Sequence, residues 1–554
     1  MTFTRLHFTG RRMATLAIAM LAMILAAATT AQAQTFSVLY DFGTNGTAGA
    51  NPSNPGILAQ GRDGNMYGTT VNGGTNGVGT VFQITPAGTL TVIYSFNEAQ
   101  GFAPYAGLTL GTDGNFYGAT LYGGTSGFGT LFQITSSGKL TVLYNFTGGT
   151  DGLYPSAPPV LGTDGNWYGT SQGDFATPGT LYRLTPAGRF KLLYTFVGPQ
   201  INAFPVAPLF LATDGNFYGI TEIGGTNNVG TLFKVTAGVL KVVFNFDGTH
   251  GTSPLAPVIQ GTDGDLYGTT SGGGSMGAGV VFKSPLGAKP TVLYNVPGGT
   301  GPYAPYGGLV QATDGKFYGT TYQGGAVNDG DIFSITSKGQ VTPLFDFDGT
   351  TGFRPEVTLF QNTNGILYGD TVEGGTGTPC QNVGCGVLFS WNQGLKPFVS
   401  FVAPTGSGKI GKTVEILGQG FTGTTGVSFD GVAATFTFVS DTYLTAAVPA
   451  GAKTGSVTVT TPGGTLTSNI SFRVTPVILS FSPSSGKVAT SVTITGQSLA
   501  QTTKVAFGGK AATFVVNSDT QVTATVPTGA KTGTISITTK GGTATGSGVF
   551  TVLQ

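Results

Sequence analysis

Few residues in this sequence have the type and spacing that catalysis requires. His250 is the only histidine after residue 33, and it lies in a Gly/Thr-rich segment. A Ser-His-Asp triad would need this imidazole beside an activated serine, and no serine elbow between a strand and a helix is indicated. One histidine cannot form a His-rich metal site either. The sequence therefore predicts a solvated loop histidine, with no metal and no cofactor.

Acidic residues gather in one stretch of the chain. Two neighbouring carboxyl groups can serve as a general acid and base, and clustered carboxylates also attract hard cations. The alternative, which we favour, is a solvated acidic rim. The residues are Asp329, Asp331, Glu356, Asp370 and Glu373.

A second set of candidates is aromatic and lies beside recurring prolines. Aromatic rings with few charges around them suit stacking on sugars or holding a peptide. The alternative is that these rings cover the core and steer the chain into the next strand. The predicted binding residues are Phe102, Tyr105, Tyr154, Phe204, Tyr303, Tyr306 and Arg354, with Phe353 next to the last of them.

The only two cysteines, Cys380 and Cys385, lie close together in the segment TPCQNVGC. In an exported protein this spacing predicts a local disulfide. The ring it closes is short, so we expect a modest stabilisation and a fixed loop.

The elements that must position these side chains come from seven repeats of about fifty residues. A DGNxYGxT box recurs 49–51 residues apart, at Asp63, Asp113, Asp164, Asp214, Asp263, Asp314 and Asn364, and a box such as GTLFQIT follows each. The Asp-Gly pair suits a hairpin turn because glycine adopts positive φ without steric cost. Four short strands per repeat predict a seven-bladed β-propeller, and a solenoid is the alternative.

The acid and the tyrosine of this box recur too regularly to form one site. Each box supplies a single acid, so we expect its side chain to cap its own turn rather than to bind calcium. We expect the tyrosines to pack between blades. Loops from the fourth to the first strand and from the second to the third should emerge on the same face, where a ligand site would lie.

The fourth-strand pattern appears once before the first repeat, at Phe36–Phe42. We predict that this segment pairs with the last repeat, in the 356–394 region, and closes the ring, which removes an open sheet edge. Leu395–Phe401 should then open the next domain.

From about residue 395 the chain contains two copies of a second module. SGKIGKTVEILGQGF from Ser407 matches SGKVATSVTITGQSL from Ser485, and similar matches follow at a period of 78–79 residues. Alternating strands with glycine turns predict immunoglobulin-like β-sandwiches. The predicted domains are therefore the propeller (34–394) and two sandwiches (395–474 and 475–554), which we expect to form a short stalk.

Residues 1–33 have the pattern of a signal peptide. Three arginines precede an apolar run from Ala14 to Ala28, and Ala31-Gln32-Ala33 supplies a cleavage motif. We therefore expect an exported protein that is extracellular, periplasmic or at the cell surface, without a membrane span after cleavage. The remaining chain has a propeller of net charge −8 and sandwiches of +2 and +4. Export argues against a nucleic-acid partner, and we expect a monomer.

The repeated YGTT, GG and GT[VL]F segments over 35–394 resemble the GloVer tandem-repeat family of exported bacterial proteins. The two C-terminal copies, with the PxxGxxxGxxVxIxGxxF opening and VP-x-GAKTG, resemble IPT/TIG domains. The second copy departs from the opening at Ala489 and Leu499. The resemblance implies surface or secreted repeat proteins and binding or spacer modules, and it supplies no catalytic motif.

Three functions remain open from the sequence. The leading hypothesis is a non-enzymatic scaffold that binds or adheres to a glycan or protein. The second is a polysaccharide lyase or glycoside hydrolase that uses the acids of repeats six and seven with a Tyr or Arg. The third is a purely structural surface protein.

Overall fold

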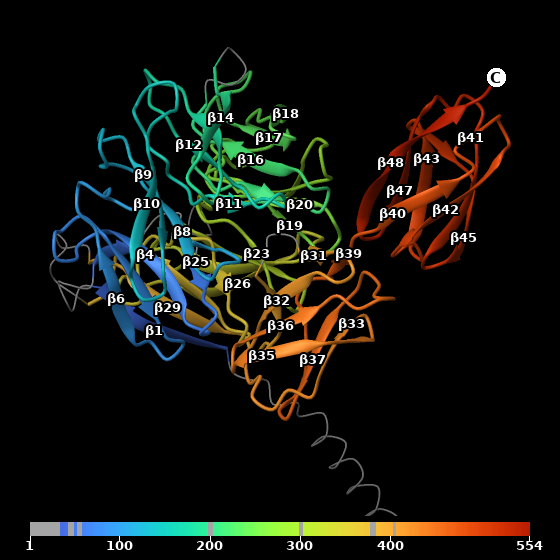
Figure 1. Ribbon diagram of the computed structural model, residues 1–554. Coiled ribbons are helices and arrows are strands. Elements are labelled where there is room, and N and C mark those ends of the chain that lie inside the picture. The colour runs from blue at the N-terminus through green and yellow to red at the C-terminus, as the bar shows by residue number, and fades with distance from the viewer. Residues whose placement is uncertain are drawn as a thin grey trace, which may run out of the picture.

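The computed structural model describes residues 34–42, 49–52, 58–197, 203–298, 303–376, 384–402 and 406–554. The forty-eight elements β1 to β48 within these ranges are all strands (Figure 1). The predicted signal peptide, residues 1–33, lies outside the described residues. None of the described residues belongs to a helix long and apolar enough to cross a membrane.

The described residues between 34 and 394 form seven small antiparallel sheets, which we call repeat sheets 1 to 7. In repeat sheets 2 to 7 a two-residue strand lies at one edge and longer strands follow, as the boxes predict; in repeat sheet 1 both β2 and the two-residue β3 pair with β4. The strands of repeat sheets 1 to 3 are β2 (Ala50–Pro52), β3 (Ala59–Gln60), β4 (Met66–Asn72), β5 (Thr80–Ile84), β6 (Leu90–Ser95), β7 (Thr109–Leu110), β8 (Phe116–Thr120), β9 (Thr130–Ile134), β10 (Leu140–Asn145), β11 (Val160–Leu161), β12 (Trp167–Ser171), β13 (Thr180–Leu184) and β14 (Phe190–Thr195). Those of repeat sheets 4 to 6 are β15 (Phe210–Leu211), β16 (Phe217–Thr221), β17 (Thr231–Thr236), β18 (Val239–Asn245), β19 (Ile259–Gln260), β20 (Leu266–Thr270), β21 (Val280–Ser284), β22 (Thr291–Asn295), β23 (Val310–Gln311), β24 (Phe317–Thr321), β25 (Asp331–Ile335) and β26 (Val341–Asp346).

Repeat sheet 7 joins the two ends of the repeat region. It contains β27 (Phe360–Gln361), β28 (Leu367–Thr371), β29 (Val387–Asn392) and β1 (Thr35–Asp41). Strand β1 pairs antiparallel with β29, and Phe36 lies opposite Trp391. The predicted closure by Phe36–Phe42 is therefore confirmed as a strand pairing. The Gln60 side chain adds a second link, because it donates to Thr363 Oγ1 at 2.8 Å and accepts from the Thr363 N–H at 3.0 Å.

The core lies between neighbouring repeat sheets. Four of the box tyrosines pack on the aromatic residue that precedes the tyrosine of the next repeat, in line with the predicted packing between repeats. The ring pairs, with centroid distances, are Tyr67–Phe116 (4.1 Å), Tyr117–Trp167 (3.8 Å), Tyr168–Phe217 (4.6 Å) and Tyr267–Phe317 (4.0 Å). These buried contacts fix each sheet against its neighbour in a propeller-like arrangement of all-β repeats.

The box aspartate caps its own turn. Asp63 Oδ1 accepts from the Asn65 N–H at 3.2 Å, and Asp63 Oδ2 accepts from the Tyr67 hydroxyl at 2.8 Å and from Gln83 Nε2 at 2.8 Å. The bond to the tyrosine was not foreseen. Burial and the Asp63 carboxylate together raise the pKa of Tyr67. Each aspartate is thus used within its own hairpin.

The C-terminal residues form two sets of sheets with matching strand order. The first set has the orders β30-β32-β36-β35 and β34-β33-β37-β38, and the second has β40-β42-β46-β45 and β41-β48-β47-β43-β44. Each set encloses its own apolar cluster. Strands of the first set are β30 (Ser400–Phe401), β31 (Ser407–Gly408), β32 (Thr413–Leu417), β33 (Gly426–Phe429), β34 (Val432–Ala434), β35 (Phe436–Ser440), β36 (Tyr443–Ala447), β37 (Val457–Thr461), β38 (Gly464–Thr467) and β39 (Arg473–Val474). Those of the second are β40 (Val477–Ser482), β41 (Ser485–Gly486), β42 (Ser491–Gln497), β43 (Thr502–Phe507), β44 (Lys510–Ala512), β45 (Phe514–Ser518), β46 (Gln521–Thr525), β47 (Gly533–Thr539) and β48 (Gly542–Val552).

The first C-terminal set packs against the repeat sheets rather than standing away from them as a stalk (Figure 1). Val402, Leu417 and Tyr443 contact Leu110 of repeat sheet 2. Arg62, in the Asp-Gly turn region, forms an ion pair with Glu415 at 2.7 Å. These contacts cover the face that carries the turns between first and second strands. The loops that leave the other end of the second strands remain uncovered by them.

Candidate functional site

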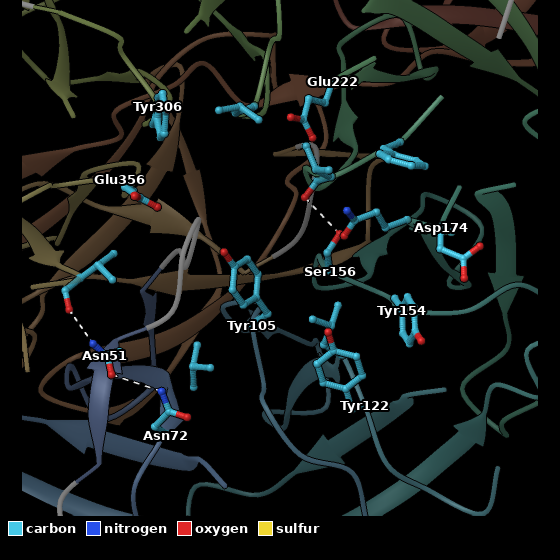
Figure 2. Close-up of a pocket in the computed structure, with 18 of the residues that line it drawn as sticks. Asn51, Asn72, Tyr105, Tyr122, Tyr154, Ser156, Asp174, Glu222, Tyr306 and Glu356 are labelled. Carbon is cyan, nitrogen blue, oxygen red and sulfur yellow. Dashed lines mark hydrogen bonds between the residues drawn. The ribbon is translucent and has the colours of Figure 1, made fainter. Parts of the chain in front are cut away.

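A cavity of about 880 Å³ opens among the loops of the repeat sheets (Figure 2). It lies on the face opposite the one that the first C-terminal set covers. Its walls come from loops between fourth and first strands and from loops between second and third strands, which confirms that the two kinds of loop share a face. Such a volume is typical of sites for small ligands.

One sequence position supplies a ring of lining side chains. In each of repeats two to seven, the residue after the loop proline faces the cavity. These residues are Tyr105, Ser156, Val206, Leu255, Tyr306 and Glu356. The position differs in character from repeat to repeat, so the cavity is asymmetric although the scaffold is repetitive.

The residue before that proline has a left-handed backbone in most repeats. The φ angles are 53° at Asn51, 50° at Ala103, 58° at Tyr154, 49° at Ser253, 53° at Ala304 and 57° at Arg354. This conformation is strained for residues other than glycine. The surrounding hydrogen bonds must hold it in place.

Tyr154 shows how the loop is held. Its N–H donates to the Phe128 carbonyl of the preceding repeat at 3.0 Å, and its own carbonyl accepts from the Gln172 N–H at 2.9 Å. Equivalent bonds tie Ser253, Ala304 and Arg354 to the repeat before them. The cavity wall is therefore fixed by backbone contacts between neighbouring repeats, independently of the side chains that line it.

Four of the predicted binding residues line the cavity: Tyr105, Tyr154, Phe204 and Tyr306. Three of these rings, those of Tyr154, Phe204 and Tyr306, contact other rings. Tyr122 meets Tyr154 edge to face at 5.1 Å, and Tyr306 stacks on Tyr322 at 4.4 Å. Phe175 contacts Phe204 at 5.3 Å, and its side chain is 97% exposed.

Three predicted residues lie outside the lining. Phe102 packs on Tyr122 at a centroid distance of 5.4 Å, and Tyr303 is 38% exposed. Arg354 pairs with Glu373 at 3.2 Å and lies over the ring of Tyr322 at 5.2 Å. The guanidinium thus supports the ring on which Tyr306 stacks.

Two glutamates bring ionisable groups to the cavity. Burial raises the pKa of Glu356 to about 7, and the carboxylate of Glu373 adds to this effect while Arg354 opposes it. Burial also raises the pKa of Glu222. In Figure 2 both side chains and the rings of Tyr105 and Tyr306 surround the same open space.

Asp370, Asp331 and Asp329, the other aspartates predicted as a cluster, are not among the residues that line the cavity. Asp370 is buried, which raises its pKa well above the ordinary value, and the Glu356 carboxylate raises it further. Asp331 is buried near Asp346, and Asp329 lies near Asp348. Among the described residues no group of three or more His, Cys, Asp or Glu side chains could hold a metal ion.

His250 and Cys385 are not among the described residues that line the cavity. His250 Nδ1 lies 2.8 Å from Asp247 Oδ1, in the loop after β18. Cys385 is buried, and its carbonyl accepts from the Asn51 N–H at 2.9 Å. Cys380 lies outside the described residues, so their disulfide stays a prediction.

Several lining residues were missed from the sequence, among them Asn72, Tyr122, Gln172 and Glu222. Asn72 is the last residue of β4, and the other three follow a second strand, at its cavity end. The sequence does contain a pattern that points to these positions. The two residues after the YGxT box differ from repeat to repeat, whereas the Tyr-Gly pair of the box recurs in every repeat. The acidic residues predicted from the sequence belong to repeats six and seven, whereas Glu222 belongs to repeat four.

Comparison with known proteins agrees with the repeat organisation. Residues 26–177, 156–389 and 205–438 match the Gloeobacter/Verrucomicrobia repeat in overlapping segments. The chain belongs to this repeat family. Residues 476–552 match the IPT/TIG domain, so the second C-terminal set of sheets is a domain of that kind. The resemblance to the repeat family is confirmed, and the resemblance to the IPT/TIG domain is confirmed for the second C-terminal copy.

No curated protein sequence matches the chain. Among solved structures, a fungal alcohol oxidase of the AA5 family in complex with copper is 15% identical, over 91% of this chain and 98% of its own, with a TM-score of 0.42. A putative gluconolactonase is 11% identical over 66% of this chain and 94% of its own, with a TM-score of 0.37. The surface glycan-binding protein PbSGBP-B from Prevotella bryantii is 19% identical over 26% of this chain and 37% of its own, with a TM-score of 0.21. These values are too low to transfer a function.

Proposed function

We propose that this chain is an exported or surface-associated protein that binds glycans without turning them over. In this proposal, residues 34–394 form a seven-bladed propeller that carries the binding cavity. Residues 395–474 and 475–554 form two immunoglobulin-like units. Residues 1–33 direct export.

The observation that carries this proposal is the composition of the cavity wall. Tyr105, Tyr154, Phe204 and Tyr306 present aromatic surface, while Asn72 and Gln172 are among the lining amide side chains. Aromatic faces stack on the apolar faces of sugar rings, and amides can both donate to and accept from hydroxyl groups. The lining is concave and mixed in polarity, which suits a glycan better than the flatter surface of a protein partner.

A second candidate function is glycoside hydrolysis. It is favoured by Glu356, whose pKa of about 7 would let it donate a proton near neutral pH. Glu222, in the same cavity, would be the second carboxyl group that such a reaction needs. A purely structural role, the third hypothesis, would leave the cavity without a ligand.

A glycan array with the full chain, followed by product analysis on each bound glycan, distinguishes these functions. Binding without cleavage supports our proposal, and cleavage that is lost in Glu356→Gln supports hydrolysis. The variants Tyr105→Ala, Tyr154→Ala and Tyr306→Ala should each weaken binding about tenfold or more, since stacking contacts are worth roughly 1–2 kcal/mol. Tyr303→Ala is the matched control, because this tyrosine lies outside the lining. Failure to bind any glycan would overturn the proposal.

A further inference from the structure

We propose that the cavity selects glycans that carry a positively charged amino group, such as de-acetylated hexosamines, and rejects uronic acids. This inference rests on the proposed function and names the chemical class of sugar that the same cavity takes.

The charged side chains of the described lining are all acidic. Asp174, Glu222 and Glu356 line the cavity, and its described wall contains no lysine, arginine or histidine. Arg354, a basic side chain near Glu356, is already committed to Glu373 at 3.2 Å and to the face of Tyr322. A carboxylate on a sugar would therefore find like charge and no free cation opposite it. An ammonium group would find carboxylates without a basic partner in the wall.

The aromatic side chains favour the same ligand. An ammonium group is attracted to the face of a tyrosine or phenylalanine ring within about 6 Å, most strongly where water is excluded. At Tyr306 an ammonium group could contact an aromatic face and also be attracted by the acidic side chains of the lining. Burial raises the pKa of its hydroxyl, and the charges of Glu356, Tyr303 and Glu222 raise it further, while the Arg354 guanidinium opposes them. Both glutamates of the lining therefore act on this ring. A cation beside Tyr306 is therefore within electrostatic reach of two carboxylates.

The affinity for such a cation should depend on the ionisation of Glu356. The groups around this carboxyl are the Glu373 carboxylate, the Arg354 guanidinium and the buried Asp370, with Tyr306 and Glu222 within the cavity. Since the pKa of Glu356 is about 7, its negative charge is mostly absent at pH 5.5 and present at pH 8.5. A permanently charged ligand should bind more tightly as the pH rises through this range, and a neutral ligand should not.

Isothermal titration of the full chain with two matched ligands tests the inference. The first probe is an N,N,N-trimethyl chito-tetrasaccharide, whose charge does not titrate, and the second is the neutral N-acetyl tetrasaccharide. At pH 8.5 and low salt we expect the cationic probe to bind about tenfold or more tightly than the neutral one, and its affinity to fall about fivefold at pH 5.5. Glu356→Gln and Glu222→Gln should each lower the affinity for the cationic probe about fivefold. Glu98→Gln, the same change at an exposed site outside the lining, should leave it unchanged.

The possible outcomes distinguish a failure of the charge selection from a failure of the proposed glycan binding. Equal affinity for the two probes, or tighter binding of oligogalacturonate than of either, overturns the charge selection and leaves glycan binding in place. Tighter binding of the cationic probe that survives both Gln variants also overturns it, because the lining carboxylates would then not be responsible. Absence of binding to every glycan on the array overturns both.

Discussion

Replacing Asp331 by threonine should stabilise the repeat region at neutral pH. Asp331 begins β25, where repeats one to four have threonine. In those repeats the threonine hydroxyl pairs with a hydroxyl of the second strand at 2.7–2.8 Å, as between Thr70 and Thr80. Asp331 is only 1% exposed, and its Oδ1 atom has no hydrogen-bond partner among the described residues. The Asp331 carboxyl group therefore occupies a buried position that holds a threonine hydroxyl in repeats one to four.

The size of the effect follows from the pKa of this carboxyl. Burial raises it to about 7; the neighbouring Thr321 hydroxyl opposes the shift, and Asp346 adds to it. In an unfolded chain the pKa is about 3.9. Below pH 4 both states are protonated and the cost is absent, and between pH 4 and 7 the folded state loses about 1.4 kcal/mol per pH unit. Above pH 7 the loss is constant at roughly 4 kcal/mol.

Differential scanning calorimetry of the full chain and of Asp331→Thr between pH 4 and 8 measures this difference. We expect similar Tm values at pH 4 and a variant about 5 °C more stable at pH 8. Thr80→Asp is the reciprocal variant, since Thr80 is equally buried, and it should lose stability as the pH rises. A difference that does not change with pH, or a less stable Asp331→Thr at pH 8, would refute the reasoning.

Three further predictions concern closure, domain contact and the cavity. Phe36→Ala should destabilise the repeat region by about 2–3 kcal/mol in chemical denaturation, because the half-buried ring stacks on Phe345 at 3.9 Å in the closing strand; an unchanged midpoint would contradict closure by β1. Arg62→Ala removes an ion pair with Glu415 and a ring contact with Tyr443 at 4.7 Å, so the calorimetric transitions of the repeat region and the first C-terminal set should move apart by a few degrees; one unaltered transition would argue against this contact as a coupling point. Tyr105→Ala should leave the Tm within about 2 °C of the parent, because this side chain lines a cavity rather than the core; a large loss of stability would assign the ring to packing.

The repeat architecture was predictable because each turn requires particular residues. An Asp-Gly or Asn-Gly turn and the tyrosine box mark the first hairpin of each repeat, and the extra fourth-strand pattern at Phe36–Phe42 reveals the closing pairing. The cavity was only partly predictable. Glu222 and Glu356 are far apart in the sequence, and they line one cavity because loops of different repeats open onto the same face. The docking of Val402 and Leu417 on Leu110 depends on shape complementarity, which no local pattern encodes.

A crystal structure of the full chain with the oligosaccharide selected by the array tests the central claim most directly. We predict that the sugar lies in the 880 Å³ cavity, with a ring against Tyr105 or Tyr306 and its glycosidic bonds intact. A sugar bound to the C-terminal sheets or to the outer strands of the repeat sheets, with this cavity empty, would contradict the account.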